Sequence, residues 1–182
     1  MRLFIAIPIP PDVRRALVDA QAQLRQIASG GRYVPQNNFH ATLHFIGESS
    51  SIVEASSAME QAVRGIRPFL FRLESFGRFY RGEQYTAYIS LGGDLLELYR
   101  LHETLVGALA DFGFSTRGAK RLTPHVTLAR GLTAAAGEDT FSSLVLSAGA
   151  GRAFTANQVV LYESRNVNGS MVYTPIHKCM LI

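Results

Sequence analysis

Hydrophobic residues follow two different periods along the chain, and these periods predict the order of its strands and helices. Short apolar runs without a helical period, several rich in β-branched and aromatic residues, predict strands. The predicted strands cover residues 2–9, 39–47, 69–80, 84–91, 125–130, 153–163 and 171–181. Because several strands follow one another as neighbouring pairs, antiparallel pairing is favoured.

Apolar residues at helical spacing predict three helices between these strands. The helices run from the prolines at 10 and 11 to Gly30-Gly31, from Ser51 onward with a capping box to Glu54, and from Asp94 to Gly113. A weak helix or loop is predicted over 138–147. Antiparallel strands with helices packed on one face define an α+β layer fold. No linker is rich enough in Pro or Ser to divide the chain, so residues 1–182 are expected to form one domain.

Composition narrows the class of protein further. The chain has 182 residues, of which 47% are hydrophobic, which excludes a disordered or fibrous protein. No apolar stretch reaches the roughly 18 residues of a membrane span, and the apolar start is broken by prolines, so neither a membrane protein nor a signal peptide is expected. The single cysteine, Cys179, allows no internal disulfide and fits a reducing compartment, hence a cytoplasmic location. The net charge of +4 favours partners that carry phosphate, although the arginines are scattered.

A duplicated tetrad is the strongest chemical signal in the sequence. The pattern His-x-Thr-Leu occurs at His40–Leu43 and again at His125–Leu128. A shuffled chain of this composition would contain about 0.03 such tetrads, so two copies are not expected by chance. The copies are separated by nearly half the chain, which indicates an internal duplication.

Both tetrads lie in predicted strands, where side chains alternate between the two faces. His40 and Thr42 therefore share one face of their strand, as do His125 and Thr127, while the intervening apolar residues face away. Two such strands related by a pseudo-two-fold axis would bring two imidazoles and two hydroxyls around one cleft.

This set of groups suits the opening of a cyclic phosphodiester without a metal. Free imidazole has a pKa near ~6.5, so two histidines can divide the acid and base roles near neutral pH. Two threonine hydroxyls can donate hydrogen bonds to the non-bridging phosphate oxygens. No carboxylate cluster, cysteine pair or dense histidine set is present to hold a catalytic ion, so neither metal nor cofactor is expected.

The chain resembles the 2H phosphoesterase superfamily, and within it the RNA 2',3'-cyclic phosphodiesterases, also called 2'-5' RNA ligases. The resemblance rests on four segments: the opening RLFIAI with Pro10, FHATLHFIG at 39–47, LTPHVTLAR at 122–130, and LYES at 161–164. It implies a bilobal α+β fold in which two antiparallel sheets line a central cleft, with the helices on the outer faces. The implied activity is hydrolysis of RNA or nucleotide ends that carry a 2',3'-cyclic phosphate, with 2'-5' ligation as a possible reverse reaction.

The resemblance also implies roles for individual residues. His40 would donate a proton to the leaving O3' atom, and His125 would activate water. Thr42, Thr127 and Arg130 would contact the phosphate, and Phe45 would stack on a base. Strict alternation, however, places Phe45 and Arg130 on the face opposite the histidines, so their roles require the strands to end or to bulge before them.

Several alternatives remain open at the level of sequence. His44 lies four residues after His40, which would allow a metal pair only on a helix, so a place in the cleft wall is favoured instead. His102 is expected beside the leucine stripe of its helix, at the boundary between the buried and the exposed face, and His177 is expected in a structural position. The rival functions are a phosphoesterase for small cyclic nucleotides or 2'-5' oligoadenylate, and a non-catalytic module that binds RNA ends. A monomer without an obligate protein partner is expected.

Overall fold

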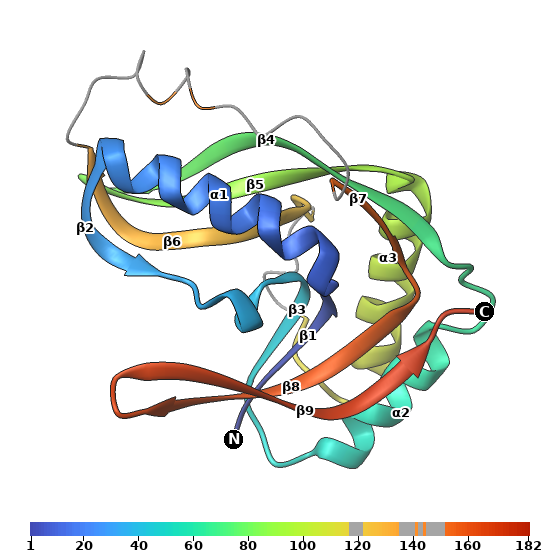
Figure 1. Cartoon of the computed structure of the whole chain (residues 1–182). Helices are drawn as coiled ribbons and strands as arrows, with labels where there is room; N and C mark the ends of the chain where they lie inside the picture. Colours follow the sequence, from blue (N-terminus) through green and yellow to red (C-terminus); the bar gives the residue numbers. More distant parts are fainter. Residues whose placement is uncertain (117–121, 135–140, 142–143, 145–151) are drawn as a thin grey trace.

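The protein is an α+β fold built from one sheet and three helices within the residues that the structure describes. The computed structural model describes residues 1–116, 122–134, 141, 144 and 152–182. The elements in chain order are β1 (Arg2–Pro8), α1 (Pro11–Ile27), β2 (Ala28–Tyr33), the short 3-10 helix η1 (Gln36–Asn38), β3 (His40–Glu48), α2 (Ile52–Ala62), β4 (Phe69–Arg81), β5 (Gln84–Gly93), α3 (Leu95–Asp111), β6 (His125–Ala134), β7 (Ala153–Ala156), β8 (Gln158–Val167) and β9 (Ser170–Met180) (Figure 1).

The strand order shows the internal duplication directly. Hydrogen bonding links the strands in the order β7-β4-β5-β6-β3-β1-β8-β9, with β2 added to β6, and all the pairings are antiparallel. The order is symmetric about its centre, because β6 and β3, β5 and β1, and β4 and β8 occupy equivalent places. The two central strands pair at a single position, Ala41 with Val126. The sheet therefore consists of a five-stranded half, which includes β2, and a four-stranded half, joined at one point, here called the junction.

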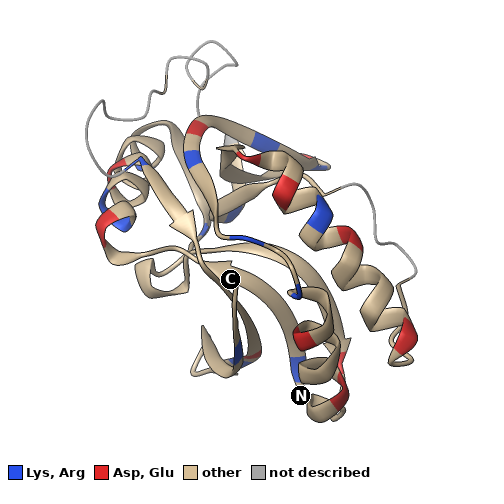
Figure 2. Cartoon of the chain, turned by 90° about the vertical axis from the view of Figure 1, so that its right-hand side faces the viewer, with Lys and Arg blue, Asp and Glu red and all other residues tan. Residues whose placement is uncertain are grey.

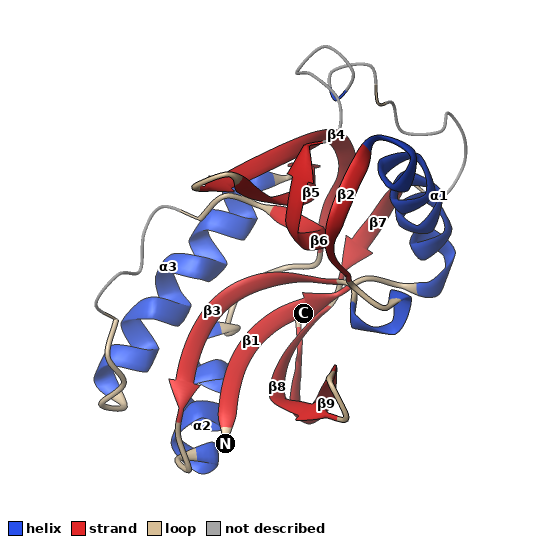
Figure 3. Cartoon of the chain, turned by 90° about the vertical axis from the view of Figure 1, so that its left-hand side faces the viewer, coloured by secondary structure: helices blue, strands red, loops and turns tan. Residues whose placement is uncertain are grey.

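The helices cover the outer faces of both halves. Helix α1 packs against β2 and β6, while α2 contacts β8 and β9 and α3 contacts β3 and β4 (Figure 3). The helical residues that face the sheet are fully buried, among them Leu17 of α1, Met59 of α2 and Leu105 of α3. The outward face of α3 carries both acidic and basic residues, as a solvated helix face does (Figure 2). This arrangement leaves the inner face of the sheet free of helices.

The α+β class and its duplication are thus confirmed, with the two expected sheets joined edge to edge at the junction. Strand β2 was not predicted from the sequence, because Gly30 and Gly31 were interpreted as the end of the first helix. Both glycines have φ of +68°, and a Cβ atom on Gly31 would lie 2.7 Å from the carbonyl oxygen of Arg130. Their function is therefore to let β2 approach β6 closely. The predicted strand 153–163 is divided into β7 and β8, and most of the predicted element at 138–147 lies outside the described residues.

Candidate active site

The two tetrads meet at the junction. Pairing of Ala41 with Val126 sets a register in which His40 lies opposite Thr127 and Thr42 lies opposite His125. Each histidine therefore has the threonine of the other half across from it. The predicted convergence of two imidazoles and two hydroxyls is what this register produces, and the positive charge of His125 is one of the causes that lower the pKa of His40.

Strand β3 bulges at the last residue of its tetrad. Its partner strand β1 pairs Ala6 with Thr42 and Ile5 with His44, so Leu43 is an extra residue without a partner on β1. Leu43 and His44 are consequently both buried, at 3% and 9% exposure, instead of pointing to opposite faces.

Strand β6 bulges at the equivalent residue of the second tetrad. Its partner β5 pairs Tyr88 with Thr127 and Ala87 with Ala129, which leaves Leu128 as the extra residue. Leu128 and Ala129 are both fully buried, like Leu43 and His44 in the first half. The duplication has therefore preserved the backbone irregularity as well as the tetrad.

The bulge at Leu128 is held from outside the β5–β6 ladder. The carbonyl oxygen of Leu128 accepts a hydrogen bond from the backbone N–H of Val34 and another from Nε2 of Gln21, both at 2.8 Å. Gln21 lies on α1 and is only 4% exposed, and its Nε2 atom also donates to the carbonyl oxygen of Val34. A buried polar side chain that satisfies two backbone acceptors fixes the local path of both strands.

The twin bulges reverse the alternation and bring two further residues to the inner face. After each bulge, the second residue points into the cleft, so Phe45 and Arg130 line the same pocket as His40. The expectation from strict alternation is therefore wrong, and the bulge that their roles required is present. The bulge has the opposite effect on His44, whose side chain is buried toward α3. Burial lowers the pKa of His44, and the charge of His102 on α3 lowers it as well. His44 is not among the residues that line this pocket, and neither are Thr42, His125 and Thr127, so a place for His44 in the cleft wall stays a prediction.

The ring of His40 is fixed by a backbone carbonyl and two aromatic side chains. Nδ1 of His40 lies 2.7 Å from the carbonyl oxygen of Asn38, and a carbonyl oxygen can only accept, so Nδ1 carries a hydrogen. The Nε2 atom is then the nitrogen available to a substrate. Phe4 and Tyr173 flank the ring, with centroids 4.9 Å and 5.3 Å away.

His125 is held in the same way in the other half. Its Nδ1 donates to the carbonyl oxygen of Thr123 over 2.7 Å, again two residues before the histidine. Phe79 and Tyr88, which stack on each other at 4.3 Å, approach the ring to 5.1 Å and 5.2 Å. Tyr88 lies across Gly77, where a Cβ atom would meet its ring at about 2.2 Å. Both histidines thus present Nε2 from a rigid, partly aromatic setting.

Burial controls the charge of the two histidines. The pKa of His40 is lowered to about 4, mainly by desolvation, with the carbonyl of Asn38 opposing the shift and the positive charges of Arg130 and His125 contributing to it. The pKa of His125 is also lowered, mainly by burial and then by Arg130. Both imidazoles are therefore neutral near pH 7, and a bound anion would favour their protonated forms.

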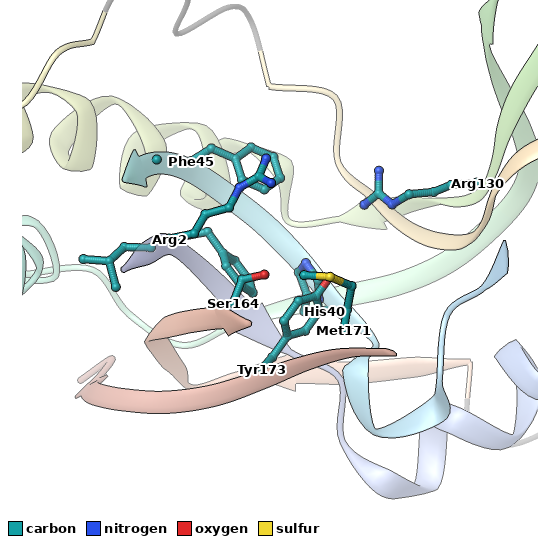
Figure 4. A pocket seen from close by; sticks show the side chains of 10 residues that line it. Arg2, His40, Phe45, Arg130, Ser164, Met171 and Tyr173 are labelled. Atoms are coloured by element: carbon teal, nitrogen blue, oxygen red, sulfur yellow. The ribbon is translucent and has the colours of Figure 1, made fainter. Parts of the chain in front are cut away.

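A pocket of about 360 Å³ opens beside His40 on the inner face (Figure 4). Its walls come from β1, β3, β6, β8 and β9, and the side chain of Arg130 reaches toward it from the other half of the sheet (Figure 4). The ring of Phe45 is 62% exposed, which is unusual for a phenylalanine and leaves one face free for stacking. The lining residues are Arg2, Leu3, Phe4, His40, Phe45, Gly47, Arg130, Ser164, Met171 and Tyr173.

Six of these residues were not predicted as site residues from the sequence, namely Arg2, Leu3, Gly47, Ser164, Met171 and Tyr173. Arg2 opens β1, and Met171 and Tyr173 belong to β9, which is separated from β3 by β1 and β8. Tyr173 gave no signal because aromatic residues in strands are usually part of the core. Phe4 also lines the pocket and stacks on Tyr162 with centroids 5.2 Å apart.

The remaining histidines lie away from the pocket. Nε2 of His177 on β9 lies 3.2 Å from Oε1 of Glu60 on α2, and His102 lies on α3. In the described part of the chain, no group of three His, Cys, Asp or Glu side chains is arranged to hold a metal ion. The same residues include no helix that is both long and apolar enough to cross a bilayer.

The fold and the paired tetrads define a 2H phosphoesterase, and comparison with known proteins gives the family. The model of the 2'-5' RNA ligase superfamily matches residues 10–168, so the chain belongs to this superfamily. The RNA 2',3'-cyclic phosphodiesterase of Thermotoga maritima is 30% identical over 71% of this chain and 70% of its own length. The enzyme of the same name from Escherichia coli is 26% identical over 99% of this chain and 96% of its own.

Solved structures agree with this assignment. A crystal structure of a protein from Thermus thermophilus superposes with a TM-score of 0.81 at 27% identity, covering 100% of this chain and 98% of the other. The crystal structure of E. coli LigT complexed with 3'-AMP superposes with a TM-score of 0.70 at 27% identity, covering 99% of this chain and 96% of the other.

Proposed function

We propose that the protein hydrolyses 2',3'-cyclic phosphate ends of RNA to 2'-phosphate ends, with His40 and His125 as the proton carriers. The observation that supports this most directly is the quartet at the junction, in which each histidine faces the threonine of the other half. Relatives with the same fold are named for this activity. Adjacent to the quartet lie a cation, Arg130, and an exposed aromatic ring, Phe45, which suit a phosphate and a base respectively.

The proposed step needs no group beyond this chain and water. Nε2 of His125 takes a proton from water while the water oxygen forms a bond to phosphorus. The bond between phosphorus and O3' breaks, and Nε2 of protonated His40 gives its proton to O3'. The product carries a 2'-phosphate and a 3'-hydroxyl. Thr42, Thr127 and Arg130 donate hydrogen bonds to the non-bridging oxygens throughout, where charge redistributes in the transition state.

The reverse step follows from microscopic reversibility. A 5'-hydroxyl in place of water would attack the cyclic phosphate and form a 2'-5' bond without ATP. Because water is present in large excess, hydrolysis is expected to dominate in dilute solution.

An end-group assay tests the proposal. RNA that ends in a 2',3'-cyclic phosphate should be converted to a 2'-phosphate end, and the rate should be the same in EDTA because the proposed step uses no divalent ion. Sensitivity to phosphatase distinguishes the opened end from the cyclic one, and co-migration with authentic 2'-phosphate and 3'-phosphate standards identifies the isomer. Complete loss of activity in EDTA with recovery on adding a divalent ion would contradict the two-histidine step, and a 3'-phosphate product would reverse the assignment of the leaving oxygen.

The pH dependence should differ between the free enzyme and the substrate complex. The active form holds one proton on the pair, and burial lowers the pKa of His40 to about 4 and that of His125 below its usual value. The profile of kcat/KM should therefore be a bell whose maximum lies below pH ~6.5, with a tenfold fall for each pH unit on its alkaline side. The bell in kcat should lie at higher pH, because the bound phosphate anion favours the protonated imidazoles. A kcat/KM profile that is flat between pH ~6.5 and ~8 would contradict this prediction.

We further propose that the protein acts as a cytoplasmic monomer. The thiol of Cys179 is buried, and burial raises its pKa to about 11, so it is poorly suited to disulfide exchange. Analytical ultracentrifugation over a range of concentrations tests the monomer.

A further inference from the structure

A second pocket of about 300 Å³ adjoins the one beside His40. The two share Arg130, Met171 and Tyr173, so they form one continuous groove. The second pocket lies between β2, η1 and the tip of the β8–β9 hairpin. Its other lining residues are Arg32, Tyr33, Val34, Pro35, Asn38, Gly169 and Ser170, none of which is acidic.

Two arginines lie side by side in the lining of this pocket. Arg32 of β2 and Arg130 of β6 are direct partners in the antiparallel ladder, so their side chains leave the sheet on the same face. Like charges in directly opposite positions destabilise a sheet. Among the described residues that line the pocket, none is acidic, so none of them offsets this repulsion. The pair is therefore arranged to receive an anion from solution.

The wall of this pocket is tied to the catalytic histidine. Nδ2 of Asn38 donates to the carbonyl oxygen of Met171 over 2.7 Å, which holds the β8–β9 hairpin against η1. The backbone carbonyl of the same Asn38 accepts from Nδ1 of His40. Asn38 therefore contributes both to the second pocket and to the orientation of His40. Its hydrogen bond to the carbonyl oxygen of Met171 holds the pocket wall that faces Arg32.

We propose that the second pocket binds the nucleotide that precedes the cyclic end in an RNA chain, with the phosphodiester between the two nucleotides held by Arg32 and Arg130. This inference rests on the proposed function, because it takes the cyclic phosphate to lie at the histidine pair. The terminal base then occupies the first pocket against Phe45, and the preceding nucleoside lies against the apolar wall formed by Val34 and Pro35. The site accordingly selects RNA ends over free cyclic mononucleotides.

Binding of two product ends tests the inference without requiring turnover. The probes are adenosine 2'-phosphate, which fills only the first pocket, and the dinucleotide ApA with a terminal 2'-phosphate, and both are titrated by calorimetry. The wild-type chain should bind the dinucleotide more tightly. Arg32→Ala should weaken dinucleotide binding about tenfold relative to mononucleotide binding, the loss expected for one charge-assisted hydrogen bond. Arg32→Lys should restore part of the difference, and Arg64→Ala, at an exposed arginine remote from both pockets, should leave both affinities unchanged.

The stability of the variant provides a second, independent readout. Because Arg32→Ala removes one of two opposed cations, the melting temperature should not fall, which separates a ligand-binding role from a structural one. Equal weakening of both probes would show that Arg32 contacts the terminal phosphate, and no weakening of either would show that it contacts no ligand; both results overturn the inference. Tight dinucleotide binding by a wild-type chain that fails to hydrolyse cyclic ends would instead overturn the proposed function and retain the site.

Discussion

Replacement of either tetrad histidine with alanine should reduce hydrolysis of a 2',3'-cyclic phosphate by about 10²–10⁴-fold, the usual contribution of a positioned acid or base. Each variant also removes a ring that packs against aromatic side chains and donates to a backbone carbonyl, so the melting temperature is measured beside turnover to separate a loss of folding from a loss of chemistry. The matched control is His177→Gln, which removes an imidazole whose partner, Glu60, lies on the outer helix α2. That variant should retain normal turnover, because His177 lines neither pocket. Its stability should also change little, since contacts between partly exposed charged groups contribute little to stability.

A modified substrate separates the two roles. In a cyclic substrate whose 3' oxygen is replaced by sulfur, the leaving thiolate departs without a proton. His40→Ala should then recover much of the lost rate, whereas His125→Ala should not, because water still needs a base. Recovery of His125→Ala alone would exchange the two roles. The pKa of His40 is lowered to about 4, so His40 must gain its proton with the help of the bound phosphate anion. The experiment therefore tests whether this histidine can act as the acid.

The central quartet was predictable because it depends on local patterns. Two copies of one tetrad, each in a β-rich segment, specify that a histidine and a threonine share a face, and the duplication specifies that the copies meet. The register of Ala41 with Val126 agrees with that reasoning. The helices were predictable for the same reason, since apolar residues at helical spacing need no knowledge of distant partners.

The bulges after the tetrads were not predictable, because a bulge is a property of two strands. Leu43 is an extra residue only in relation to Ile5 and Ala6, and Leu128 depends in addition on Gln21 and Val34 from outside its ladder. Sequence alternation treated each strand alone and therefore placed Phe45 and Arg130 on the wrong face. Only the structure shows that in each copy the two residues after the threonine are both buried.

The walls of the groove escaped prediction for a different reason. Tyr173 and Met171 lie on β9, which is brought toward β3 only by the pairing of β8 with β1. No local pattern encodes that contact. Strand β2 was missed because its sequence, ASGGRY, is small and polar, yet it supplies Arg32 to the second pocket.

Removal of either threonine hydroxyl should cost on the order of 10²-fold in turnover, as for other donors aimed at a transition-state oxyanion. The register places Thr127 opposite His40 and Thr42 opposite His125, so both hydroxyls are available to one phosphate held between the imidazoles. Thr→Ser at either site should retain much of the activity, because it keeps the donor. Thr→Val keeps the branched shape that suits a strand but removes the hydroxyl, so its melting temperature should stay close to that of the wild type while its kcat falls.

This pair of substitutions matters most at Thr127, which is only 8% exposed and packs beside Tyr88 in the ladder. If the valine variants at both positions turned over substrate at the wild-type rate, the threonines would serve only to form the strands, and Arg130 with the backbone amides would have to hold the phosphate without them.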